Sequence, residues 1–259
     1  MALPTSVRLG GEPGLQYVLR LADTCLILSH RLSQWCGHAP VLEEDIAMTN
    51  IALDLVGQAR ALLSRAGQMG DPKYDEDQLA FLREERDYRN ITLVELPRGD
   101  FGFTVLRTTM VATFLKLLWQ RLAPSCDPEL AAIAGKAFKE ARYHQQHAAD
   151  WVIRLGDGTP ESQRRMAAAL VQLWPYTHEL FDSDAIDEQA AQTGLGPRWC
   201  DLQPAWLAEM GLILRPAGLT TPAETGFRSA GKQGVHSEHM GFILGELQYL
   251  QRAYPGGAW

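Results

Sequence analysis

Four long segments of the chain repeat apolar residues at intervals of three and four, the spacing that places side chains on one face of an α-helix. They span residues 14–36, 41–66, 101–122 and 128–155, and stretches containing glycine and proline interrupt the pattern between them. Long helices joined by short connections pack as antiparallel neighbours. Because no run of residues alternates between apolar and polar, the sequence predicts no sheet. We therefore expect an all-α fold whose core bundle covers about residues 14–155.

The rest of the chain predicts shorter helices that add to this bundle. Residues 159–161 (Thr-Pro-Glu) form a typical helix start, with a capping hydroxyl, a proline in the first turn and an acid near the helix N-terminus. Pro175 is expected to kink this helix or end its regular hydrogen bonding. We expect a single domain over residues 1–259, with additional C-terminal helices at about 159–254. The segments expected there are helices at 182–194 and 198–214, a loop at 215–229 and a last helix at 237–254.

Charge and composition exclude several classes of partner. A formal net charge of −7 and a pI near 5.5 oppose binding to the phosphates of DNA or RNA. No window approaches the roughly 20 uninterrupted apolar residues of a membrane-spanning helix, and the first residues show no secretory signal. We therefore expect neither nucleic acid nor a membrane as a partner. Widely spaced cysteines without a C-x-x-C pair are typical of free thiols in the cytoplasm; they are Cys25, Cys36, Cys126 and Cys200.

Long helices in a bundle raise the question of a metal centre. Ferritin-like di-iron proteins carry a carboxylate on each of two helices and an E-x-x-H pair on each of the other two, with both residues of a pair facing the metals. None of the seven histidines here has Glu or Asp three positions before it. In the two helices where the motif is expected, Ala141 precedes His144 and Leu55 precedes Gln58. Neutral side chains suit a centre without metal, because buried carboxylates lacking cations repel one another.

A different metal site could be built from Glu140, His144 and His147, which share one face of their helix, and Asp54 on a neighbouring helix. We prefer the interpretation that these four side chains form hydrogen bonds across helices or face a partner, because polar groups between packed helices are usually satisfied in this way.

Two further motifs have simpler structural explanations. Residues 226–232 match most of the G-x-x-x-x-G-K phosphate loop, but Gln233 stands where Ser or Thr is required and no strand precedes the loop. We interpret this segment as a flexible, glycine-rich connector. The histidine-rich segment 236–239 lies at an expected helix start, where Ser237 and Glu238 are predicted to cap the helix rather than bind a metal.

Charged residues are concentrated at positions 75–90, where we expect a short exposed helix. The commoner meaning of such a run is a solvated charged face. Alternatively, guanidinium groups and a tyrosine can grip a phosphorylated or adenine-bearing ligand, because arginine binds phosphate through two hydrogen bonds. The side chains concerned are Arg83, Arg86, Tyr88, Arg89 and Asn90.

Four long blocks of the sequence carry a family resemblance. They are LRLADTCLILSHRLSQWCGHAP at 19–40, IALDLVGQARALL at 51–63, FKEARYHQQHAADWVIRLGDGT at 138–159 and SAGKQGVHSEHMGFILGELQYLQRAYPG at 229–256. With these blocks the chain resembles the PaaC family of the bacterial 1,2-phenylacetyl-CoA epoxidases, from about Leu19 to Trp259. Blocks of this length are more specific than any single short motif.

The resemblance implies a ferritin-like, non-catalytic structural subunit of a multicomponent monooxygenase in aerobic phenylacetate degradation. Its main partner would be a homologous catalytic subunit, which holds the di-iron centre and which this chain supports. Further small components and a reductase that delivers electrons from NADPH would complete the complex. This chain itself would bind no cofactor.

The resemblance also implies which positions have lost metal ligands. At the positions equivalent to Leu55, Gln58, Ala141 and His144, the catalytic subunit would hold Glu, His, Glu and His. Its two other acids would fall near Cys25 and Ala112. Only His144 therefore keeps a ligand here, and no catalytic role is carried over. The degenerate positions are Cys25, Leu55, Gln58, Ala112, Ala141 and His144.

The family further implies contact between this chain and the CoA part of the substrate. The first segment expected to bind it is Asp87, Tyr88, Arg89 and Asn90, and the second is Glu188, Gln189 and Ala190. Two alternative functions stay open at this point. One is a self-sufficient di-iron oxidase built on Asp54, Glu140, His144 and His147, and the other is an independent acyl-CoA-binding protein.

Overall fold

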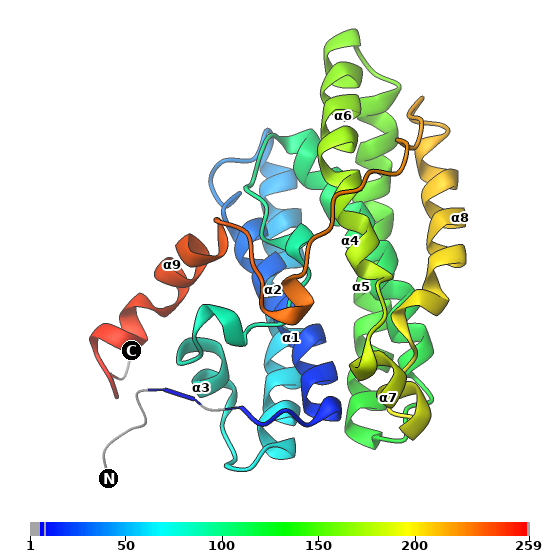
Figure 1. The fold of residues 1–259 in the computed structure, drawn as a ribbon. Coiled ribbons are helices and arrows are strands. Elements are labelled where there is room, and N and C mark those ends of the chain that lie inside the picture. Colours follow the sequence, from blue (N-terminus) through cyan, green and yellow to red (C-terminus); the bar gives the residue numbers. More distant parts are fainter. Residues whose placement is uncertain (1–5, 8, 258–259) are drawn as a thin grey trace.

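The computed structural model describes residues 6–7 and 9–257, so that residues 1–5, 8 and 258–259 of the predicted domain lie outside the described residues. Within the described part the chain forms nine α-helices and no β-strand (Figure 1), which confirms the predicted all-α fold. The helices are α1 (Pro13–Ser33), α2 (Leu42–Met69), α3 (Glu76–Phe81), α4 (Phe101–Leu122), α5 (Pro128–Gly156), α6 (Pro160–Leu173), α7 (Ala185–Thr193), α8 (Gln203–Leu214) and α9 (Met240–Ala253).

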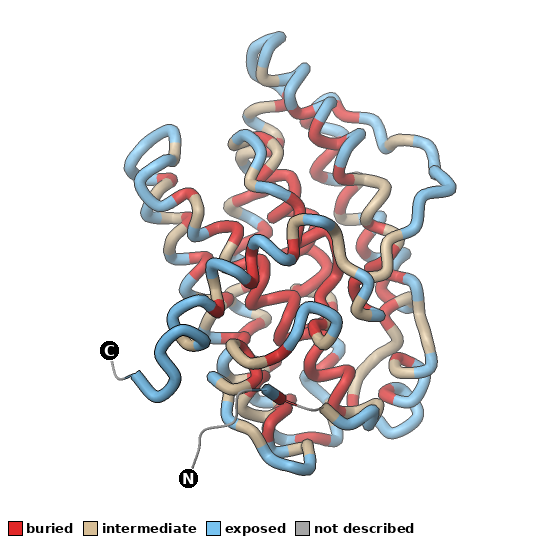
Figure 2. Tube along the Cα trace, turned by 60° about the vertical axis from the view of Figure 1, so that its left-hand side comes forward, coloured by how far each residue is buried: buried red, intermediate tan, exposed pale blue. Residues whose placement is uncertain are grey.

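The core is built from two antiparallel helix pairs, α1 with α2 and α4 with α5, which lie side by side in Figure 1. These are the four long helices that the apolar spacing predicted, and each begins or ends within three residues of its expected bounds. Buried residues follow the middle of the four helices, whereas exposed residues collect at their ends and outer faces (Figure 2). The four predicted long helices thus surround the buried centre of the described structure.

Capping side chains set the starts of the helices on the second side of the bundle. Asp100 accepts a hydrogen bond from the backbone N–H of Phe103 at 2.8 Å, which fixes the start of α4. Asp127 accepts from the first free N–H groups of α5, and Pro128 occupies the first turn. Thr159 caps α6 as predicted, through a reciprocal arrangement with Ser162. Short polar residues thus separate α4, α5 and α6 into three helices.

Helix α4 is the most apolar element of the bundle. With its length and its mean hydropathy of 1.3, α4 is long and apolar enough to cross a membrane. This was not predicted from the sequence, because only uninterrupted apolar runs were considered there. However, 89% of the apolar window is buried inside the protein. The neighbouring helices α5, α6 and α8 supply the apolar surroundings that a bilayer would otherwise provide. This burial is consistent with the core helix of a soluble protein.

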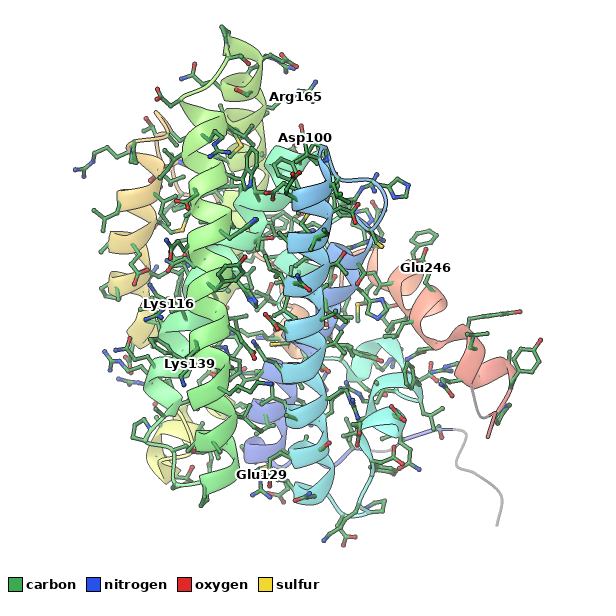
Figure 3. The ribbon with its side chains drawn as sticks, turned by 180° about the vertical axis from the view of Figure 1, so that it is seen from behind. Asp100, Lys116, Glu129, Lys139, Arg165 and Glu246 are labelled. Carbon is green, nitrogen blue, oxygen red and sulfur yellow. The ribbon has the colours of Figure 1, made fainter. Side chains whose placement is uncertain are left out.

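The C-terminal third covers one side of the bundle. Regular helix α6 ends at Leu173, and a 3₁₀ stretch that contains Pro175 follows at Trp174–Leu180, as the proline predicts. After α7 and α8, residues 215–239 run across the side of the bundle seen in Figure 1 and lead to α9, which packs on α3. On the reverse side α2 and α5 lie next to each other, and no other described helix lies over them (Figure 3).

Three local predictions are wrong. Residues 75–90 do not form an exposed helix: α3 has six residues, and the side chains of Arg83, Tyr88 and Asn90 are fully buried because they bond to groups inside the protein. Helix α9 begins at Met240 with His239 as its N-cap residue and has no side-chain cap; the Ser237 hydroxyl accepts from the backbone N–H of His239 at 3.4 Å and does not reach the first turn. The expected flexible connector ends in a buried Lys232, whose ammonium donates to the Asp182 carbonyl at 2.6 Å.

Candidate functional site

The six positions that the family resemblance predicts to have lost metal ligands come from all four core helices and are all buried, with at most 4% of any residue exposed. Cys25 lies on α1, Ala112 on α4, and α2 and α5 each contribute two positions. The sequence comparison within helices therefore located residues that do line the interior of the bundle. The positions on α2 and α5 are Leu55, Gln58, Ala141 and His144.

A short hydrogen-bonded chain connects three helices at this level. The thiol of Cys25 lies 3.6 Å from Oε1 of Gln58, and Nε2 of Gln58 donates to Oε2 of Glu140 at 2.9 Å. Beside it, Nε2 of His144 lies 2.9 Å from Oδ2 of Asp54. Because a carboxylate only accepts hydrogen bonds, this contact places the imidazole proton on Nε2. The links run from α1 through α2 to α5.

Burial keeps the interior of this site uncharged. It raises the pKa of the Cys25 thiol far above its usual value, and the negative charges of Glu140 and Asp23 act in the same direction. Burial also lowers the pKa of His144, although its hydrogen bond with Asp54 opposes the shift. At neutral pH the site thus holds a thiol, an amide and a neutral imidazole.

This set of side chains does not fit a pair of iron ions. Ferritin-like di-iron centres are held by four carboxylates and two histidines, whereas Leu55, Ala112 and Ala141 have no ligand atoms. The donor atoms that remain bond to neighbouring side chains in other helices. Among the described residues, no group of three or more His, Cys, Asp and Glu side chains is placed to hold a metal ion.

The alternative metal site also resolves into separate pairs. His144 pairs with Asp54, Glu140 with Gln58, and Nε2 of His147 lies 3.0 Å from Oε2 of Glu44. Each pair joins α5 to α2. The first two are hydrogen bonds across helices, as predicted, whereas His147 and Glu44 lie within ion-pair distance without forming a hydrogen bond. We refer to the three contacts as the α2–α5 ladder.

The first predicted substrate-binding segment divides into two buried and two accessible residues. The hydroxyl of Tyr88 donates to the Ala80 carbonyl at 2.5 Å, and burial raises its pKa to about 12. Nδ2 of Asn90 donates to Glu95 at 2.8 Å. Both side chains therefore stabilise the fold. Asp87 and Arg89 are half-buried and face outward.

Asp87 and Arg89 line a groove with a volume of about 380 Å³. Its other walls come from α1 and from the start of α7, and its residues include Arg20, Asp184, Ile186 and Lys232. Glu188 and Gln189 lie further along α7 and are exposed, Ala190 is buried, and none of the three lines the groove. The structure thus brings part of the first segment, and not the second, to this groove.

Sequence reasoning missed a network of buried charges, which we call the arginine–histidine network, formed by Asp23, Arg83, Glu95 and His236. Arg83 donates to Asp23 through two nitrogens, one of them at 2.9 Å, and neither side chain is exposed. Nδ1 of His236 lies 2.6 Å from Oε1 of Glu95, and both of these side chains are also fully buried. One signal was present, because Arg20 and Asp23 interrupt an otherwise apolar helix.

The fold and the site together define a class: a ferritin-like helical bundle whose central positions carry too few ligands for a di-iron centre. A sequence model of the family described as "Phenylacetic acid catabolic protein" matches residues 10–259. A protein of Escherichia coli (strain K12), named as the C subunit of 1,2-phenylacetyl-CoA epoxidase, is 48% identical over 243 residues, which cover 94% of this chain and 98% of that protein. The chain belongs to the phenylacetic acid catabolic protein family.

Proposed function

We propose that this chain is a non-catalytic subunit of a cytoplasmic phenylacetyl-CoA epoxidase and that it supports the di-iron catalytic subunit of that complex. The observation that carries the proposal is the neutral centre of the bundle, where apolar or bonded side chains occupy the positions of metal ligands. High identity to a relative named as the C subunit of such an epoxidase supports the assignment to this complex. Electrons would come from NADPH through a reductase component and would not pass through this chain.

The chain's own contribution would be mechanical. A catalytic bundle that opens a channel for its substrate loses core packing, and a second bundle docked beside it restores a rigid setting for the metal ligands. The links among α1, α2 and α5 hold this bundle together without a metal. The surface that would contact the catalytic subunit can be rigid only if the helices beneath it are linked in this way.

The groove at Asp87 and Arg89 supports contact with the CoA part of the substrate. Arg89 donates through Nε to Gln16 and through Nη1 to two backbone carbonyls, so its guanidinium is held in place at the groove wall. A fixed guanidinium suits the phosphates of CoA. Arg20 contributes less, because Asp184 and Asp187 already pair with it.

Reconstitution tests the proposed function. The catalytic subunit is purified separately from this chain and together with it, iron is measured in each protein, and NADPH-dependent epoxidation is assayed with the reductase. We expect negligible iron in this chain, iron in the catalytic subunit, and turnover only when both are present. Stoichiometric iron in the isolated chain, with ring oxygenation when the catalytic subunit is left out, would support the self-sufficient oxidase instead.

Calorimetry with phenylacetyl-CoA tests the remaining alternative against the proposed function. An independent acyl-CoA-binding protein binds the thioester without partners, whereas a supporting subunit gains affinity only in the complex. Arg89→Gln is expected to weaken binding to the complex about tenfold, the loss of one charge-assisted contact. Arg164→Gln, at an exposed position on α6, serves as the control.

A further inference from the structure

The outer face of α2 and α5 has no other described helix over it. Figure 3 shows the two helices next to each other in front of the bundle, with Lys139 labelled on α5. The C-terminal segment that crosses the bundle runs over the opposite side (Figure 1). The surface has the α2–α5 ladder along its seam.

Apolar residues are exposed on this face in a helical pattern. Leu42, Ile46 and Leu53 of α2 are 72%, 54% and 62% exposed, and they lie on one side of the helix because they are separated by four and seven positions. Tyr143 of α5 is 54% exposed and stacks on His147 of the ladder. A stripe of large apolar side chains along a solvent-facing helix is typical of an interface.

Two glycines in helix interiors are compatible with docking on this face. A Cβ atom at Gly57 of α2, or at Gly135 of α5, would have no atom within 4 Å, so nothing inside this chain requires glycine there. Glycine is less stable than alanine in the interior of a helix. Both glycines fit the close approach of an external backbone, but Gly211 of α8 and Gly245 of α9 are equally unhindered, so the glycines do not select this face by themselves.

The size of the face matches a stable interface. Helices of 28 and 29 residues are about 42 Å long, and two neighbours present a strip about 20 Å wide. The product, about 800 Å², equals the surface that each partner buries in a standard protein interface. Helix α9 also exposes Phe242 and Tyr249, but with 14 residues it is about 21 Å long and offers too little surface alone.

Charge identifies the kind of partner. The chain carries a net charge of −7, yet the middle of this face exposes Lys136, Lys139 and Arg142 on α5. Lys136 lies 3.5 Å from Glu140 of the same helix, and Asp54 of α2 is bonded to His144, so that Lys139 and Arg142 are left without an ion-pair partner among the described residues. Two copies of such a face would oppose basic residues to each other, whereas an acidic partner would neutralise them. The surface therefore favours a different protein over a second copy of this chain.

We propose that the outer face of α2 and α5 docks a helical partner whose matching surface is apolar with acidic side chains opposite Lys136, Lys139 and Arg142. This inference rests on the proposed function and names the surface by which the chain would bind the catalytic subunit. The glycines permit close helix packing, the apolar stripe supplies buried area, and the basic residues set the orientation.

Affinity measurements between separately purified chains test the surface. Ile46→Glu and Leu53→Glu each place a charge in the stripe and are expected to raise the Kd for the catalytic subunit tenfold or more. Lys139→Glu with Arg142→Glu should mainly slow association and remove its salt dependence. Leu212→Glu on α8 alters a residue that is 74% exposed and should leave the Kd within about twofold.

Gly57→Met separates docking from folding. It should raise the melting temperature of the isolated chain, because methionine favours the helix, and it should weaken binding to the catalytic subunit. Normal binding by the α2 and α5 variants, with loss in Leu212→Glu or Phe242→Glu, would move the interface elsewhere and leave the proposed function standing. Failure of the unaltered chain to bind the catalytic subunit would overturn both proposals. If instead the chain forms dimers and Ile46→Glu dissociates them, the partner on this face is a second copy, and the choice of partner is overturned.

Discussion

The centre of the bundle and the arginine–histidine network both bury polar side chains, but they do so with opposite chemistry. At the centre, Cys25 and Gln58 are neutral and the carboxylates bonded to the site, Asp54 and Glu140, lie toward the outer edge of the α2–α5 seam. In the network, by contrast, fully buried carboxylates face a buried guanidinium and a buried imidazole. One region is built from neutral side chains, whereas the other holds paired charges.

The two regions differ because their carboxylates would depend on different sources of positive charge. Carboxylates at the centre of a ferritin-like bundle depend on metal ions, so a chain that gives up the metal is more stable when it also gives up the acids. In the network, Arg83 and His236 belong to the same chain as the acids they pair with, and folding itself brings them together. The backbone of residues 88–89 contacts both pairs, because the Arg89 N–H donates to Asp23 and the Tyr88 carbonyl lies 3.2 Å from Nε2 of His236, and this links α1 to the segment that precedes α9.

The largest expected effect comes from breaking the network. Asp23→Leu would leave the Arg83 guanidinium buried without a counter-charge and would remove the acceptor for the Arg89 backbone N–H. We expect a loss of about 3–5 kcal/mol in the free energy of unfolding, measured with denaturant.

Two further variants make this comparison specific. The double change Asp23→Leu with Arg83→Leu should recover part of the loss, because no unpaired charge stays buried. The matched control is Arg60→Ala, which breaks an exposed pair with Glu76 and should cost at most about 1 kcal/mol. A loss as small as this control in Asp23→Leu would show that the network does not stabilise the fold.

A somewhat smaller effect is expected when charge returns to the centre. Leu55→Glu restores an acid of the metal motif without its cation and should cost about 2–4 kcal/mol at neutral pH relative to Leu55→Gln. The expected pKa of the new carboxyl is raised, so this cost should appear above the pKa of an unfolded glutamate and vanish as the pH falls below it. Iron that stabilises the single variant would contradict the neutral-centre interpretation.

The sequence was sufficient to locate the centre because the pattern that marks it lies within single helices. Residues three and four positions apart share a helix face, so the frames of Leu55 with Gln58 and of Ala141 with His144 could be compared with a ligand motif without any structure. The long helices were predictable for the same reason, since each hides one side along its whole length.

The network escaped prediction because its partners are distant in the chain. Asp23 and Arg83 are 60 positions apart, and Glu95 and His236 are 141 apart. A cluster of arginines in a sequence is normally interpreted as a solvent-exposed face, unless the buried acids that pair with it are known. The same reason explains why Tyr88 and Asn90, expected to contact substrate, instead hold the fold.

The smallest effect contrasts two histidines. The Glu95 hydrogen bond and charge outweigh burial and raise the pKa of His236, so its stabilisation is complete below the unfolded value near 6.5 and is lost as the pH rises through the folded pKa. Burial lowers the pKa of His144 despite Asp54, so its stabilisation is complete above about 6.5 and declines as the pH falls. Stability curves from about pH 5 to about pH 8.5 should therefore show opposite trends for His236→Gln and His144→Gln relative to the unaltered chain, each with a slope below about 1.4 kcal/mol per pH unit, the limit for one proton. Parallel trends would mean that the two regions handle buried charge in the same way.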